Sequence, residues 1–213
     1  MIEVRVLTGA DLDAALDDVA RLRINVFREW PYLYDGDFEY ERNYLSAYRE
    51  NPAAVLVGAF DGTSLIGAAT GTPMLDHADE FASAFGGLKW DLSKVFYCAE
   101  SVLLVEYRGH GIGHKFFDLR EAHACTLGCE KVAFCAVIRP ENHPLRPQSY
   151  RSLDAFWLKR GYQPLPDVVA QFKWKDIDAS DETQNRYSSG RTIYMFEISV
   201  IAFRKLRTSS KVL

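Results

Sequence analysis

Apolar and polar positions in the first fifty residues follow two different periods. From Ile2 to Leu7 they alternate every second residue, which is the pattern of a half-buried strand. From Leu12 to Phe27 apolar residues recur every three or four positions, which predicts an amphipathic helix, and a second helix is expected over 38–50. The aromatic stretch between the two helices, Arg28–Gly36, has no period, so we expect it to be irregular.

Four strands and one long helix are predicted in the middle of the chain. The strands 53–60 and 64–71 flank Asp61-Gly62, which is a strong hairpin signal. The segment 95–105 is apolar and rich in β-branched residues, and 131–138 is apolar enough to be a strand buried on both faces. Between these two strands, apolar residues at helical spacing predict a helix that is closed by Gly128.

The remaining segments complete a mixed α/β pattern. Residues 73–92 predict one or two short helices, and 149–160 predict another helix, stopped by Gly161. Two alternating strands, 169–176 and 192–200, follow. This order predicts an α/β fold of the α+β type, with a central mixed sheet flanked by helices, in a single domain spanning 1–213.

Composition removes several classes of function. The 213 residues include 25 Lys and Arg against 29 Asp and Glu, so the net charge of −4 offers no general attraction to nucleic acid or to an anionic membrane. We find no apolar run long enough to span a bilayer and no signal peptide at the N-terminus, so a cytoplasmic protein is expected. None of the four cysteines forms a C-x-x-C pair, and we predict buried, reduced thiols and no metal site.

The sharpest chemical signal lies in residues 103–114, LLVEYRGHGIGH, at the start of the predicted helix. Glycines at 109, 111 and 113 let the backbone approach a ligand closely and turn its N–H groups inward. The first amides of a helix also have no intrahelical acceptor, and the helix dipole adds positive potential there. The pattern predicts a binding site for a diphosphate group.

Several Gly-rich motifs compete for this segment. A P-loop requires Gly-Lys-Ser/Thr where this chain has Gly113-His114, so that motif is excluded. A dinucleotide fingerprint beginning at Gly109 requires a third glycine at position 114, which is His114. A tight turn without a ligand is the remaining structural alternative.

The hexad from Arg108 to Gly113 resembles the [Gln/Arg]-x-x-Gly-x-[Gly/Ala] pattern of the GNAT acetyltransferase superfamily, and Phe156–Pro164 (FWLKRGYQP) resembles a later helix of that family. The resemblance implies acetyl-CoA as co-substrate, with its pantetheine arm between two splayed strands. It implies pyrophosphate contacts along the turn, to Arg108, Gly109, His110, Gly111, Ile112, Gly113 and His114. It further implies pantetheine contacts to the backbone of Leu103, Leu104 and Val105.

Two residues are candidates for the acid–base steps. An alkyl amine has a pKa of about 10 and must lose a proton before it attacks a thioester. Glu100, a carboxylate in an apolar strand, is the candidate base or anchor for the cationic amine, with an exposed strand residue as the alternative. The family's usual acid, a Tyr, is replaced here by Trp157, and Tyr150 is the candidate substitute, with simple helix-start packing as the alternative.

The aromatic run after the first helix is predicted to form the acceptor wall, through Trp30, Tyr32 and Tyr34. We therefore expect an N-acetyltransferase that acts on a primary amine of a small molecule or peptide. Two alternatives remain: an acyl-CoA sensor without turnover, and a module whose aromatic run binds a protein partner. A homodimer is left open by the sequence.

Overall fold

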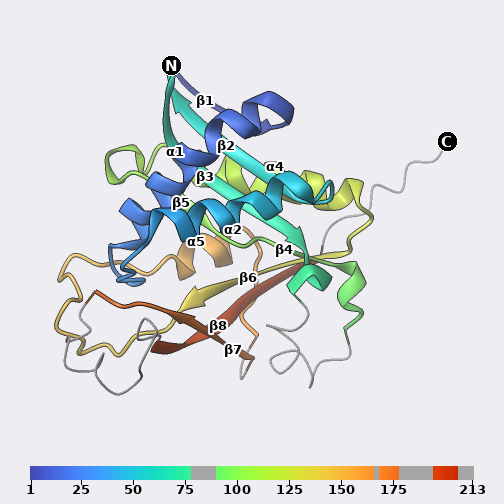
Figure 1. Cartoon of the computed structure of the whole chain (residues 1–213). Coiled ribbons are helices and arrows are strands. Elements are labelled where there is room, and N and C mark those ends of the chain that lie inside the picture. The colour runs from blue at the N-terminus through green and yellow to red at the C-terminus, as the bar shows by residue number, and fades with distance from the viewer. Residues whose placement is uncertain (78–89, 166–167, 178–193, 206–213) are drawn as a thin grey trace, which may run out of the picture.

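The computed structural model describes residues 1–77, 90–165, 168–177 and 194–205. Two long helices follow the first strand, and the later helices alternate with strands (Figure 1). The elements are β1 Ile2–Leu7, α1 Gly9–Phe27, α2 Phe38–Glu50, β2 Val55–Asp61, β3 Ser64–Pro73, β4 Val95–Tyr97, β5 Ser101–Leu103, α4 Ile112–Thr126, β6 Lys131–Val137, α5 Asp154–Lys159, β7 Val169–Trp174 and β8 Tyr194–Lys205. Short 3-10 turns occupy Met74–His77, Leu92–Lys94 and Val105–Tyr107.

The strands form one mixed sheet in the order β1-β2-β3-β4-β6-β8-β7, with β5 paired to β3. Only the β4–β6 pairing is parallel among the described strand pairs, and the others are antiparallel. Strand β4 pairs with β6 on one side and β3 on the other, whereas β5 pairs with β3 alone. The sheet therefore parts between β5 and β6, as the family resemblance implied.

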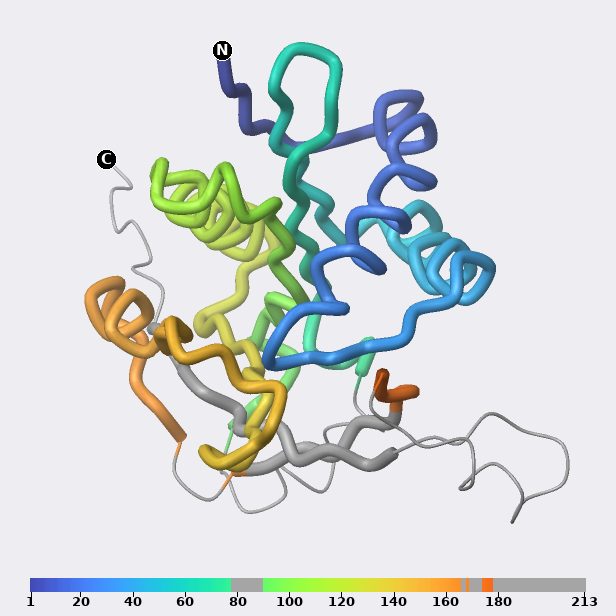
Figure 2. Tube along the Cα trace, turned by 90° about the vertical axis from the view of Figure 1, so that its left-hand side faces the viewer, coloured from blue at the N-terminus to red at the C-terminus, as the bar shows by residue number. Residues whose placement is uncertain are grey.

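Helices cover both faces of the first half of the sheet (Figure 2). Helices α1 and α2 pack on one face through a core that includes Val19, Leu45 and Val102. Helix α4 covers the other face, where Phe116 and Phe117 pack against the strands, and α5 lies beside it. Each fully buried side chain of this size contributes about 1.5–3 kcal/mol to folding, so the two layers hold the sheet from both sides.

Several sequence predictions are confirmed. Helix α2 has the expected bounds, and the Asp37 side chain caps it by accepting a hydrogen bond from the amide of Tyr40 at 2.9 Å. The hairpin between β2 and β3 turns at Gly62, whose φ of 60° suits glycine. Helix α4 ends before Gly128, which has a φ of 73°.

The prediction of one continuous strand over 95–105 is wrong. The amide of Ala99 donates to the carbonyl of Thr70 at 3.1 Å, and the amide of Thr70 donates to the carbonyl of Glu100 at 3.1 Å. Two successive residues thus oppose one residue of β3, which is a β-bulge, and the bulge turns the chain away from β6. The hydrophobic pattern of the sequence does not reveal this break, because the side chains on both sides of it are apolar.

The predicted helix over 149–160 is shorter than expected. Helix α5 covers only Asp154–Lys159. The Ser152 hydroxyl accepts a hydrogen bond from the amide of Asp154 at 3.1 Å, and the amide of Tyr150 donates to the carbonyl of Pro147, so the chain before α5 forms turns. The last strands occupy 169–174 and 194–205, close to the expected ranges. Of the helices predicted over 73–92, the described part contains only the two 3-10 turns, and 78–89 lie outside the described residues.

Candidate active site

The Gly-rich turn has the backbone geometry that the sequence predicted. Gly109 and Gly111 have φ values of 84° and 79°, which favour glycine, and Gly111 is the N-cap of α4. A Cβ atom built on either residue would meet no other atom within 4 Å, so the space beside this turn is open. The first amides of α4 lie beside this open space, at the positive end of the helix dipole.

The side chains of the turn point in different directions. The Arg108 guanidinium donates to the carbonyl of Leu103 at 3.1 Å and pairs with Glu29 at 2.8 Å, so it links the turn to the end of α1. His110 is exposed. The ring of His114 lies 4.8 Å from that of Phe156, which directs it toward α5 and away from the turn.

The parting of the strands leaves backbone groups without strand partners. The amide of Leu104 donates to the carbonyl of Ile66 at 3.0 Å, so the even-numbered residues of this stretch exchange hydrogen bonds with β3. In an antiparallel pair the alternate residues point the other way, which directs the backbone groups of Ser101 and Leu103 into the gap facing β6. Val105 lies beyond the strand, in the 3-10 turn, and its carbonyl accepts a hydrogen bond from the amide of Arg108 at 3.1 Å.

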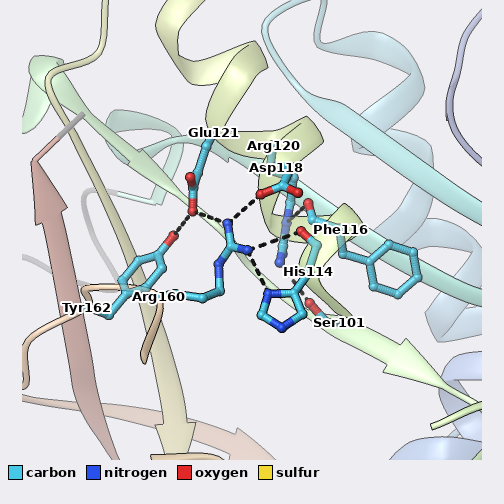
Figure 3. A network of polar contacts seen from close by, with 8 residues as sticks. All are labelled: Ser101, His114, Phe116, Asp118, Arg120, Glu121, Arg160 and Tyr162. Carbon is cyan, nitrogen blue, oxygen red and sulfur yellow. Dashed lines mark hydrogen bonds and ion pairs between the residues drawn. The ribbon is translucent and has the colours of Figure 1, made fainter. Parts of the chain in front are cut away.

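A buried arginine fixes the bulge from the α4 side. Arg120 is 1% exposed, and its guanidinium donates to the carbonyls of Thr70 at 3.0 Å and Glu100 at 2.9 Å. It also donates to the Ser101 hydroxyl at 2.8 Å (Figure 3). Its Nε donates to the carbonyl of Phe116 at 3.2 Å. Arg120 thus gives each of these two carbonyls a second hydrogen bond and ties the bulge to α4. Sequence reasoning missed it, although its spacing of four from Phe116 places it on the buried face of the helix.

Glu100 lies at the bulge, and its side chain projects toward α1 and α2. Its carboxylate forms an ion pair with Arg23 of α1 and accepts a hydrogen bond from the Tyr44 hydroxyl at 3.3 Å. Arg23 also donates to Glu41 of α2 at 2.5 Å, and the side chains of Arg23 and Glu100 are 9% and 8% exposed. The next residue, Ser101, faces the opposite side of the strand, since its hydroxyl accepts a hydrogen bond from Arg120 of α4.

Arg23, Glu41 and Glu100 form what we call the acidic triad. When all three are ionised, two carboxylates surround one guanidinium, which leaves one net negative charge in a site with little water. The Arg23 guanidinium also lies 4.5 Å from the ring centroid of Tyr44. The sequence signal for Arg23 is its spacing of four residues from both Val19 and Phe27, which places a charge on the apolar face of the helix.

Tyrosine side chains surround the triad. Burial raises the pKa of the Tyr32, Tyr44 and Tyr48 hydroxyls, and the Glu100 carboxylate raises it further. Burial likewise raises the pKa of Tyr97, with smaller contributions from Cys135 and Glu100. These hydroxyls therefore stay protonated at neutral pH and can serve as hydrogen-bond donors.

The aromatic run after α1 contributes to this site unevenly. Tyr32 packs on Phe27 with ring centroids 4.4 Å apart, and the Arg23 guanidinium lies 5.0 Å from the centroid of the same Phe27 ring, which places Tyr32 near the triad. Tyr34 lies beside Glu41, which together with burial raises the pKa of its hydroxyl. Trp30 lies apart from them, and its indole N–H is buried without an acceptor among the described residues.

Tyr150 and Trp157 differ from the expected arrangement. Tyr150 lies outside α5, in the loop before it, with its ring 6.0 Å from that of Trp30. Burial raises the pKa of its hydroxyl, and Asp154 adds to the effect. Trp157 packs on Phe134 with ring centroids 5.0 Å apart, so it serves the core.

A polar network joins α5 to α4 beside the Gly-rich turn (Figure 3). Arg160 donates to His114 Nδ1 at 3.1 Å, to Asp118 at 2.8 Å and to Glu121 at 2.9 Å. The Tyr162 hydroxyl donates to Glu121 at 2.8 Å and is buried, as expected of a core residue. This network holds the first turn of α4 in place, which explains why His114 is turned away from the glycines.

In the described ranges, no three His, Cys, Asp or Glu side chains gather as ligands of one metal ion would. None of the helices described is both long and apolar enough to cross a membrane.

Comparison with known proteins agrees with this geometry. Three similar solved structures are a candidate acetyltransferase from Salmonella typhimurium with its cofactor acetyl-CoA, an N-acetyltransferase from Thermoplasma acidophilum in complex with coenzyme A, and the polyamine N-acetyltransferase of Drosophila melanogaster. Their identities to this chain are 10%, 14% and 10%, with TM-scores of 0.56, 0.52 and 0.58. The matches cover 100%, 96% and 97% of this chain and 98%, 99% and 100% of theirs. At these identities the likeness shows the fold.

No curated protein matches the sequence significantly. The sequence model of the acetyltransferase (GNAT) family, however, matches residues 19–147, which is more than half of the chain and includes the second half of α1, the acidic triad, the bulge and the Gly-rich turn. The chain therefore belongs to the acetyltransferase (GNAT) family.

Proposed function

We propose that this protein transfers an acetyl group from acetyl-CoA to a primary amine of a small molecule or peptide. The observation that carries the proposal is the parting of β5 from β6, immediately before an open Gly-rich turn at the start of α4. Family membership and neighbours that hold acetyl-CoA or coenzyme A support acetyl-CoA as the co-substrate.

The residues present fit this co-substrate. The backbone groups of Ser101 and the amide of Leu103 face the gap and can pair with the amide groups of a pantetheine arm as a further strand would, whereas the Leu103 carbonyl already accepts a hydrogen bond from Arg108. Gly109 and Gly111 leave room for a diphosphate at the start of α4, where the helix dipole stabilises negative charge. Acetyl-CoA, when bound, supplies the thioester carbonyl carbon that the amine attacks.

The acidic triad is suited to an amine. An alkyl ammonium ion is attracted by the net negative charge of the triad and by the faces of the surrounding tyrosine rings. We propose that Glu100 anchors this cation and accepts its proton, directly or through water, before the attack. Arg23 and the Tyr44 hydroxyl hold the Glu100 carboxylate in one position, so the amine meets a fixed acceptor.

Tyr150 is the proposed donor of a proton to the departing thiolate. Burial keeps its hydroxyl protonated at neutral pH, which is the state that a general acid requires. Its place in a loop beside Trp30, and not on α5, means that the loop before α5 sets its position.

A second candidate function is an acyl-CoA sensor without turnover. It is favoured by the Glu100 carboxylate, which already has Arg23 and Tyr44 as partners, and by Trp157, which packs in the core. A sensor would bind acetyl-CoA and release no coenzyme A with any amine.

Coenzyme A release across a panel of small amines and peptides tests both candidates. We expect Glu100→Gln to lower the rate of the chemical step by about 10²–10⁴, the usual effect of removing a positioned base. The loss should shrink as the pH approaches the pKa of the amine, because more of it arrives deprotonated. Glu39→Gln, on the exposed face of α2, is the control and should leave the rate unchanged. Binding of acetyl-CoA without any turnover would favour the sensor.

A further inference from the structure

The loop 28–36, which we call the acceptor loop, is paired along its backbone to the chain that follows β7. The amide of Asp35 donates to the carbonyl of Lys175 at 2.9 Å, and the amide of Ile177 donates to the carbonyl of Leu33 at 2.8 Å. Figure 2 shows the loop beside this distant segment. A stretch that the sequence predicted to be irregular is therefore held like a short strand.

One buried side chain joins the acceptor loop to the end of β6. Arg139 Nε donates to the carbonyl of Pro31 at 2.8 Å, and its Nη2 donates to the carbonyl of Tyr32 at 2.6 Å. Its Nη1 pairs with Asp176 at 2.6 Å, and the two side chains are 5% and 3% exposed. The indole N–H of Trp174 also donates to the carbonyl of Tyr32, at 3.1 Å.

This arrangement uses the shape of a guanidinium. Its nitrogens donate in three directions within one plane, which the single ammonium group of a lysine cannot reproduce. Leu33 has a φ of 52°, which lies in a region that residues other than glycine rarely adopt. Such a backbone conformation persists only where the surrounding structure fixes it. Both observations indicate a loop that is fixed before any ligand arrives.

We propose that Arg139, together with Asp176, is a positioning residue that sets the acceptor loop so that Tyr32 faces the acidic triad. Arg139 donates to the carbonyls of Pro31 and Tyr32, which lie on either side of the Tyr32 α-carbon. The side chain of Tyr32 then packs on Phe27, whose ring also contacts the Arg23 guanidinium of the triad. Arg139 thus acts on the amine through Tyr32, without touching it, and the inference rests on the proposed acetyl transfer.

Hydrogen exchange gives the first test, because it needs no acceptor. Arg139→Lys keeps the charge opposite Asp176 but removes the fork that binds two carbonyls. We expect the amides of the acceptor loop to exchange about tenfold faster, the factor that corresponds to losing one charge-assisted hydrogen bond, with α2 and β2 unchanged. Arg28→Lys is the control, because Arg28 makes only an exposed pair with Asp35. Unchanged exchange in the loop of the Arg139 variant would overturn the inference.

Steady-state kinetics gives the second test, with the amine that the wild-type protein acetylates best. Arg139→Lys should raise the KM for the amine about tenfold and leave the Kd for acetyl-CoA within about twofold. If Arg139→Lys fails to fold, Trp174→Phe, which removes one donor to the same Tyr32 carbonyl, should shift the amine KM in the same direction by a smaller factor. An unchanged amine KM in a folded variant would contradict the inference, whereas a wild-type protein that acetylates nothing would contradict the proposed function instead.

Discussion

Arg23→Met is expected to be the most destabilising single substitution in the acidic triad. Methionine has a similar length, so the main change is the loss of charge between Glu41 and Glu100. The side chains of Glu41 and Glu100 are 1% and 8% exposed, so neither carboxylate can recover enough water. Removing one partner of a buried ion pair costs about 3–5 kcal/mol, and we expect a loss of stability in that range.

The assay is urea denaturation followed by circular dichroism at neutral pH. Arg21→Met on the same helix is the matched control: Arg21 pairs with Asp18 at 3.1 Å on the surface, so its loss should stay within about 0.5 kcal/mol.

A double-mutant cycle separates charge from packing. In Arg23→Met/Glu41→Gln one of the two carboxylates is removed with the cation, so the double variant should be more stable than the sum of the single changes predicts by about 1–3 kcal/mol. Strict additivity, or a loss below about 1 kcal/mol for Arg23→Met, would refute the view that the triad is an electrostatic unit.

Three further outcomes are expected. Gly111→Glu should abolish acetyl-CoA binding in calorimetry, because it places a side chain at a φ of 79° and an anion beside the diphosphate; equal affinity would exclude the turn as the binding site. Tyr32→Ala should raise the amine KM with little change in acetyl-CoA affinity, and a large loss of stability with unchanged kinetics would assign Tyr32 to the core instead. The folded-state pKa of Tyr48 is raised, so the stability it contributes is complete below its unfolded pKa of about 10 and is lost as the pH rises above it. The free energy of unfolding should therefore fall more steeply above pH 10 in the wild type than in Tyr48→Phe, by about 1.4 kcal/mol per pH unit, and equal slopes would contradict this.

Local patterns in the sequence predicted most of the helices and strands. Helix α2 was predicted with its observed bounds because its periodicity begins after Asp37, a capping residue, and ends where the chain turns extended at Asn51. The hairpin at Gly62 and the turn at Gly111 were predictable for the same reason, since a positive φ selects glycine within a few residues of sequence. The break at the bulge was not, because it depends on how Thr70 of a different strand pairs with both Ala99 and Glu100.

What the sequence alone determined is the family resemblance, the glycine turn and the presence of one carboxylate, Glu100, in an apolar strand. The tertiary structure decided the partners of that carboxylate: Arg23 and Tyr44 lie 77 and 56 positions away along the chain, and no local period connects them to Glu100. Likewise, Arg139 reaches the acceptor loop across 107 positions to Tyr32. Backbone periodicity depends on neighbours within one or two turns, whereas a buried charge is stabilised by whichever groups the packed layers bring within hydrogen-bond distance.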